Sequence, residues 1–258
     1  MVRVCVKNAA FAFILLISFI SSTESFAHKK CRGPDCPGFW GAFEFGYTNS
    51  ITPGNVTVQP MPNVDSPDNY IPTQQTSDWT VGVGVGYKFV GDMAFCLPAN
   101  RIGIYYDYYF ETTVRGDIDK YQTIKAYDYS YKVTSNTAWL HDQLELIEYE
   151  NFTLFIEGGI GAAFNYAFGY DETPVPANPD VRFYSADFKS HTDVNFAYRL
   201  GAGISYSLTN NIDLGIFYRY SDLGNASTGG SKNYPSMEDG LKTSFRTSQY
   251  MATLRYNA

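Results

Sequence analysis

Histidine, cysteine and basic residues are scarce in this sequence, and each shortage excludes a class of protein. The 258 residues include three His and four Cys. Neither a further His nor a second Cys pair completes four ligands with Cys31 and Cys36, so a metal site is not expected, and no cofactor is expected either. Lys and Arg number 19 against 26 Asp and Glu, a net charge of −7. A nucleic-acid partner needs a basic surface, so none is expected.

Long apolar runs are missing everywhere except at the beginning of the chain. Arg3 and Lys7 precede an apolar stretch at 9–20, and Ser25-Phe26-Ala27 fits a small-x-small cleavage site. The stretch is shorter than the roughly 20 residues of a membrane-spanning helix, so we predict a cleaved signal peptide over residues 1–27. No later run approaches 18 apolar residues, which predicts no helical span.

Aromatic residues are abundant, with 22 Tyr and 19 Phe, and they take part in a period-two pattern. Residues 199–208 and 212–220 flank the turn 209–211. Both segments alternate between an apolar face and a face of small or polar residues. Successive side chains of a strand point to opposite faces, so this is a β-hairpin. The apolar face carries Leu200, Ala202, Ile204, Tyr206, Leu208, Ile212, Leu214, Ile216, Tyr218 and Tyr220, and the other carries Arg199, Gly201, Gly203, Ser205, Asp213, Gly215, Phe217 and Arg219.

The same alternation predicts eight strands, an even number that allows a single chain to close a barrel. The stretch 133–147 is rich in Leu and Glu, and a helix over 136–149 is the competing interpretation there. The predicted strands cover residues 39–47, 79–89, 101–112, 133–147, 153–166, 194–207, 212–220 and 245–256.

Connection lengths and aromatic positions predict which face meets lipid. Long connections fall at 48–78, 113–132, 168–192 and 222–244, and short ones at 149–152 and 209–211, with 90–100 intermediate. Long loops on one side and short turns on the other are typical of outer-membrane barrels. Aromatic residues gather near both strand ends, as two bilayer interfaces select. A soluble lipocalin-like barrel is the alternative, but it would leave the row Gly82, Gly84 and Gly86 facing water.

The motifs "GFWGAFEFGYTNS", "WTVGVGVGYKF" and "YMATLRYNA" resemble eight-stranded outer-membrane barrels of the OmpA transmembrane and opacity-protein type. The resemblance covers about residue 38 to the end. It implies an all-β, up-and-down transmembrane barrel over 38–258 with long extracellular loops and short periplasmic turns, preceded by a periplasmic segment at 28–37. Leu254 and Tyr256 match the carboxy-terminal signal of the barrel-assembly machinery, although Asn257-Ala258 follow. No peptidoglycan-binding domain is expected after the last strand.

The inward face carries charges of both signs, which we expect to pair inside a lumen just wide enough for side chains. The predicted plug has Glu44, Glu157 and Arg199 near mid-height, and a narrow low-conductance pore is the alternative. His141 joins the inward set if its strand has the chosen parity. The predicted ion-pair network contains Glu44, Lys88, Asp107, Glu157, Arg199, Arg219 and Arg255, with Glu111, Glu145 and Asp213 also on the inward parity.

The loops are the expected place of function, and we expect a non-enzymatic barrel with a structural or adhesive surface role that it exerts through them. A barrel enzyme that modifies lipid A is the alternative, and it would use His141 with Ser135 or Ser205 and an acid such as Asp107. Expected partners are outer-membrane lipid and lipopolysaccharide, the assembly machinery, and a host or surface ligand of the loops. The expected location is the bacterial outer membrane.

Three cysteines remain after the predicted cleavage, and the periplasm is oxidising. Cys31 and Cys36 precede the first strand, and Cys96 lies in the 90–100 connection. In the predicted topology both segments are periplasmic, so a bridge from Cys31 or Cys36 to Cys96 and a local Cys31–Cys36 bridge are both open. Sequence alone does not order these connectivities.

Overall fold

The computed structural model describes residues 37–50, 56–58, 68–90, 99–120, 124–175, 186–233 and 240–258. No helix in these ranges is long and apolar enough to cross a membrane. The predicted signal peptide, the segment 28–36 and all three cysteines of the predicted disulfides lie outside the described residues. The strands are β1 (Gly38–Ser50), β2 (Val56–Val58), β3 (Asp68–Gln75), β4 (Asp78–Val90), β5 (Ala99–Lys120), β6 (Ile124–Tyr149), β7 (Phe152–Pro174), β8 (His191–Ser207), β9 (Ile212–Ser227) and β10 (Lys242–Asn257).

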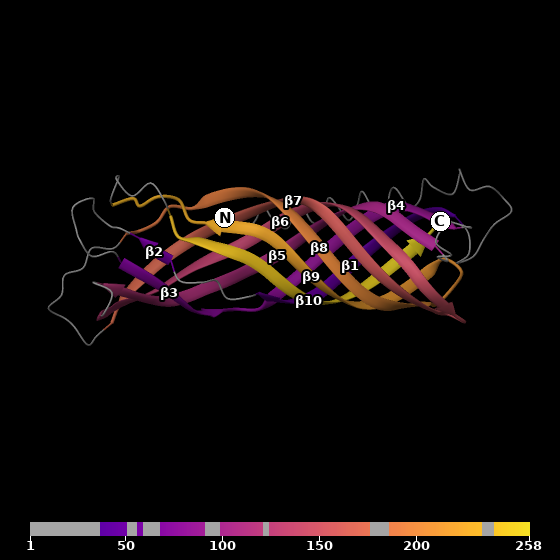
Figure 1. Cartoon of the computed structure of the whole chain (residues 1–258), viewed down its shortest axis with the longest axis horizontal. Helices are drawn as coiled ribbons and strands as arrows, with labels where there is room; N and C mark the ends of the chain where they lie inside the picture. Colours follow the sequence, from indigo (N-terminus) through magenta and orange to yellow (C-terminus); the bar gives the residue numbers. More distant parts are fainter. Residues whose placement is uncertain are drawn as a thin grey trace.

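Eight of these strands close into an elongated antiparallel barrel (Figure 1). β1 pairs with β4 on one side and with β10 on the other, and the pairing of β5 with β6 completes the ring. β3 pairs with β5 beyond the point where β4 ends, and β2 pairs with β3. The prediction of an eight-stranded up-and-down barrel is confirmed. The ambiguous stretch 133–147 is strand within β6.

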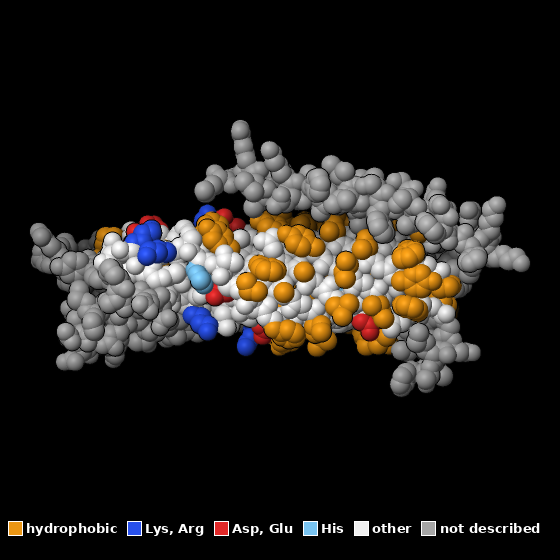
Figure 2. Space-filling model, turned by 90° about the horizontal axis from the view of Figure 1, so that it is seen from above, with side chains coloured by type: hydrophobic (Ala, Val, Ile, Leu, Met, Phe, Trp, Pro, Cys, Tyr) orange, Lys and Arg blue, Asp and Glu red, His pale blue; other side chains and the backbone are white. Residues whose placement is uncertain are grey.

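The apolar face of each strand looks outward, as the alternation predicts. Leu200 and Ile216 are each 62% exposed, whereas the neighbouring Arg199 and Arg219 are fully buried inside the barrel. Figure 2 shows the apolar side chains gathered over one part of the barrel's length and most of the charged ones beyond it. This distribution is the reverse of a soluble barrel, because lipid is the solvent for the outer face.

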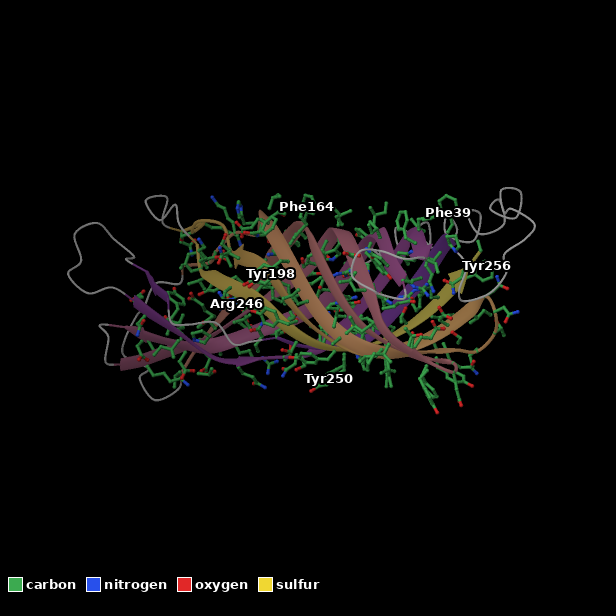
Figure 3. All side chains as sticks on the ribbon, turned by 45° about the vertical axis from the view of Figure 1, so that its right-hand side comes forward. Phe39, Phe164, Tyr198, Arg246, Tyr250 and Tyr256 are labelled. Atoms are coloured by element: carbon green, nitrogen blue, oxygen red, sulfur yellow. The ribbon has the colours of Figure 1, made fainter. Side chains whose placement is uncertain are left out.

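Aromatic side chains border the aliphatic band at both ends. Phe39 and Tyr256 lie towards the end with the short turns, and Phe164 and Tyr198 lie towards the opposite end (Figure 3). Phe152 and Tyr206 pack against each other across β7 and β8 beside the short turns, with ring centroids 4.9 Å apart and ring planes tilted by 54°. The two rows match the two interfaces of a bilayer and set the height of the membrane belt.

Several strands continue far beyond the membrane belt, into segments for which the sequence predicts loops. The predicted loop 113–132 is wrong, because β5 runs to Lys120 and β6 begins at Ile124. The predicted loop 48–78 contains β2 and β3. These segments are rich in turn-forming residues, but partners on both sides satisfy their backbone groups in a continued sheet.

The polarity of the two faces reverses in this outer extension, which comprises 111–120, 124–135 and 168–174 together with β3. Val114, Ile118 and Val133 point inward and are buried, as in a soluble protein. A bulge between Tyr109 and Thr112 of β5 marks the start of the change. The bulge adds one residue and shifts the parity. Glu111 is therefore exposed, where it binds Lys132 at 2.5 Å, and its predicted inward position is wrong.

Tyrosines fill the inside of the outer extension. The Tyr70 ring lies 5.3 Å from that of Tyr129 and 5.9 Å from that of Phe188. Phe188 comes from a loop that forms a β-bridge with Ser231. Burial raises the pKa of the Tyr129 and Tyr131 phenols well above the ordinary value, because the charged form would lose its hydration. An aromatic core therefore lies inside the outer extension.

Candidate functional site

The lumen inside the membrane belt holds the densest set of charged side chains in the described part of the chain. Five carboxylates face five cations there, and every one of the ten is at most 5% exposed. The alternation of β1, β4, β5, β6, β7, β8, β9 and β10 turns them inward. They are Glu44, Asp107, Glu145, Glu157 and Asp213, with Lys88, Arg101, Arg199, Arg219 and Arg255.

Arg219 is the centre of the upper group of charges. Its Nε donates to Oε1 of Glu157 at 2.6 Å, and its Nη2 donates to Oε2 of Glu44 at 2.7 Å. Its Nη1 lies 3.6 Å from Oδ2 of Asp107. The strands β1, β5, β7 and β9 are thereby joined across the lumen.

Arg199 lies beside this group and shares one of its acids. Its Nη1 donates to Oδ2 of Asp107 at 2.7 Å, and its Nη2 lies 2.9 Å from Nδ1 of His141. The guanidinium carbon is 4.9 Å from the ring centroids of both Tyr105 and Trp139. A delocalised cation packs favourably against such rings, so Arg199 fills the lumen as well as neutralising it.

A lower group lies towards the short turns and is centred on Arg101. Its Nε donates to Glu145 at 2.6 Å, and its Nη2 donates to Asp213 at 3.2 Å. Lys88 also binds Glu145, at 3.2 Å. The side chain of Asn257 joins this group, since its amide donates to Asp213 at 2.9 Å.

Arg255 and a layer of uncharged side chains occupy the rest of the lumen. Arg255 donates to Gln143 at 2.7 Å, and its guanidinium carbon lies 5.7 Å from the Trp40 ring. Above the charged groups, Gln249 donates to the hydroxyls of Thr48 and Thr80 at 3.2 and 3.1 Å. Charge, amide and hydroxyl layers therefore follow one another up to the aromatic core.

The residues that would form a hydrolytic triad contact other partners in this structure. Nδ1 of His141 faces the Arg199 guanidinium, and Asp107 also binds Arg199. The Ser135 hydroxyl donates to Asn165 at 2.6 Å. Among the described residues, no group of three or more His, Cys, Asp and Glu could hold a metal ion. His141, Asp107 and Ser135 therefore have partners other than one another among the described residues.

All seven charged residues predicted for the lumen lie inside the barrel, but the partnerships could not be predicted. Glu44 and Glu157 meet at Arg219, while the third residue expected at mid-height, Arg199, binds Asp107 instead. Arg101 and Gln143 were missed as members of the network. Alternation back from Tyr105 through Gly103 places Arg101 on the inward face, and this signal was available in the sequence.

Three features decide the architecture. They are a closed ring of eight strands, an apolar outer belt between aromatic rows, and a charged interior. The chain is an eight-stranded transmembrane β-barrel of the outer-membrane type. The apolar belt fits lipid and the buried charges are shielded from it, which is the arrangement that a bilayer requires.

No family model matches the chain. An uncharacterised protein of Brucella abortus (strain 2308) is 26% identical over 194 residues, which cover 70% of this chain and 60% of that protein. An uncharacterised protein of Brucella suis biovar 1 (strain 1330) matches with the same identity and coverage. The chain therefore spans less than two thirds of the length of these relatives.

Solved barrels are similar to the chain over most of its length. Neisserial surface protein A has a TM-score of 0.43 and 11% identity, covering 86% of this chain and 99% of that chain. OprG from Pseudomonas aeruginosa has a TM-score of 0.43 and 14% identity, covering 86% and 97%. The protease OmpT from Escherichia coli has a TM-score of 0.45 and 11% identity, covering 86% and 94%. The barrel architecture rests on the geometry of this chain itself.

Proposed function

We propose that this barrel is a non-conducting surface protein that presents its outer extension and loops for structural or adhesive contacts outside the cell. The height of the extension carries this proposal. At about 3.3 Å per residue and a tilt near 40°, the 26 residues of β6 rise about 65 Å, whereas the apolar band of such barrels is about 25 Å tall. A barrel that served only as an anchor would not need the remaining height.

The wall of the extension supports the same role. Lys125 binds both Asp117 and Asp128 at 2.9 Å on the outer face, and all three side chains are accessible to solvent. The inner face of the wall packs around the aromatic core, so the wall is held rigidly. A rigid polar surface above the membrane is suited to contacts with a partner, and the loops extend it further.

The charged side chains of the lumen support a barrel that does not conduct. The upper and lower charged groups leave the five acids and five cations of the lumen in mutual contact or within the same layers. We propose that these pairs plug and stabilise the barrel. An eight-stranded barrel has little interior space beyond what side chains fill, so a wide aqueous channel is not expected.

The test is binding of proteoliposomes that carry the full protein to host-cell surfaces and to immobilised matrix ligands. Brief external proteolysis that trims the loops, with the barrel intact by gel mobility, should lower binding at least tenfold. Lys125→Glu on the wall is a second variant, and Lys125→Arg, which keeps the charge, is its matched control. Equal binding by empty vesicles or by trimmed protein would reject the adhesive role.

A further inference from the structure

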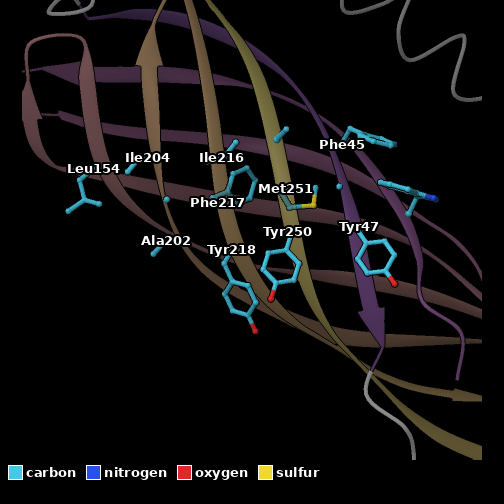
Figure 4. A pocket seen from close by; sticks show the side chains of 14 residues that line it. Phe45, Tyr47, Leu154, Ala202, Ile204, Ile216, Phe217, Tyr218, Tyr250 and Met251 are labelled. Carbon is cyan, nitrogen blue, oxygen red and sulfur yellow. The ribbon is translucent and has the colours of Figure 1, made fainter. Parts of the chain in front are cut away.

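The lipid-facing wall of the barrel has a hollow of about 670 Å³ that crosses β1, β10, β9 and β8. It results from the register of the outward side chains. Ala252 lies directly between Phe45 on β1 and Ile216 on β9. A methyl group between two large side chains leaves a depression in the apolar wall (Figure 4).

The floor of this groove consists of backbone from the neighbouring row of residues. Gly46, Met251, Phe217 and Gly203 are paired in that row, and the side chains of Met251 and Phe217 are buried inside the barrel. A Cβ atom at Gly46 would lie 2.2 Å from the Met251 sulfur. The glycines thus leave room inside the barrel for the Met251 and Phe217 side chains, and only backbone faces the groove at these positions.

Aromatic rings form the sides of the groove at the end nearest the outer extension. Phe45 stacks on Trp79 with centroids 4.8 Å apart, and Tyr218 meets Tyr250 edge to face at 5.6 Å. The Tyr218 hydroxyl donates to Ser248 at 2.9 Å, so the polar atoms lie at the rim. The interior of the groove is suited to an alkyl chain.

Cations follow the groove along the same outer face of β10. The side chains of Ser248 and Arg246 succeed Tyr250, and Lys242 follows beyond the bulge near Ser244. Outward positions recur every second residue, so Arg246 lies about 13 Å along the strand from Tyr250. Arg246 is half exposed and binds Asp222 at 3.0 Å on one side. Along β10 towards the outer extension, the outward side chains are therefore first apolar, then hydroxyl-bearing and then cationic.

We propose that this groove binds an acyl chain of lipopolysaccharide, with phosphate groups of the lipid's sugar head group on Arg246 and on Lys242. The order of groups along β10 is the order of groups in a phosphorylated lipid, and Lys and Arg at a membrane surface attract its charge. The inference rests on the proposed orientation, in which the extension is extracellular. The groove then opens to the outer leaflet, where lipopolysaccharide resides.

The experiment measures lipid retained by the full protein in mild detergent by native mass spectrometry. The probes are lipopolysaccharide lipid A, its dephosphorylated form and phosphatidylglycerol. Ala252→Phe fills the groove and should lower lipid A retention at least tenfold, whereas Ala138→Phe, an outward residue on the distant strand β6, should leave it unchanged. Arg246→Ala with Lys242→Ala should lower retention of lipid A but not of its dephosphorylated form, and Lys132→Ala is the matched control.

Several outcomes would overturn this proposal. One is lipid A retention that Ala252→Phe leaves unchanged, and another is equal retention of phosphatidylglycerol. A third is a native dimer that Ala252→Phe abolishes, because a second copy of the chain would then cover the groove. If Ala252→Phe does not fold, Ala202→Trp at the edge of the groove gives the same test. The assay contains no cells or matrix ligands, so its failure is distinct from failure of the adhesive role.

Discussion

The Arg219 guanidinium joins acids from three strands and is fully buried. We predict that Arg219→Leu destabilises the barrel by about 3 kcal/mol or more, because it leaves Glu44 and Glu157 without their cation in a low-dielectric lumen. Arg199→Leu should lower the free energy of unfolding by a smaller amount, since Asp107 keeps Arg219 nearby. Urea unfolding in lipid vesicles measures both values.

The exposed Arg115 on the outer wall provides a control for the loss of an arginine. Arg115→Leu should change the free energy of unfolding by well under 1 kcal/mol, as is usual for surface sites. If Arg219→Leu and Arg115→Leu unfold at the same urea concentration, the lumen pairs do not contribute to stability.

Position 86 requires glycine because the backbone of β5 and the Trp40 ring leave no room there for a side chain. A Cβ atom there would lie 2.2 Å from the carbonyl oxygen of Ile102 and 2.5 Å from the Trp40 ring. We predict that Gly86→Ala destabilises the barrel by about 1–3 kcal/mol through overpacking. Gly158→Ala is the control, since a Cβ atom there would lie 3.6 Å from the Leu200 side chain, an ordinary contact distance. Thermal unfolding that is the same for both variants would contradict this interpretation.

At the scale of elements, the outer extension depends on tyrosines that stay neutral. The raised pKa of Tyr131 means that the folded chain holds its proton more tightly than the unfolded chain. The stabilising effect is complete below about pH 10 and is lost as pH rises above that value. We predict that the urea midpoint falls as the pH rises above about 10, and that Tyr131→Phe makes this fall smaller. A fall of the same size in Tyr131→Phe would argue against a part for this phenol.

The ends of the strands also predict which parts of the chain are accessible from outside. The β6 extension carries Lys125, and the short turn between β8 and β9 carries Asn210. In the proposed orientation, a cysteine at position 125 reacts with a membrane-impermeant maleimide on intact cells, and a cysteine at position 210 reacts only after the outer membrane is opened. The reverse result would invert the topology.

At the scale of the whole molecule, the stacked layers of the lumen should block ion flow. We predict no large steady conductance for the unmodified protein in planar bilayers, because charged pairs, amides and the aromatic core follow one another along the barrel axis. Open channels in the unmodified protein would disprove the plug.

The sequence by itself determined the eight strands and the face that each presents to lipid, because a strand alternates its side chains with a period of two. Alternation alone therefore placed Glu44, Asp107 and Arg199 in the lumen. It did not determine which acid meets which arginine, because partners such as Glu44 and Arg219 come from strands far apart in the chain, and their contact depends on barrel closure and register.

Only the tertiary structure decided where the strands end and where their polarity reverses. The turn-forming residues of 113–132 indicated a loop, but pairing with β3, β6 and β7 supplies their backbone hydrogen bonds and extends the sheet. The bulge at Tyr109 and Thr112 moved Glu111 outward, which no alternating pattern reveals. The groove at Ala252 likewise exists only because register sets a small residue between Phe45 and Ile216, and register is a property of paired strands.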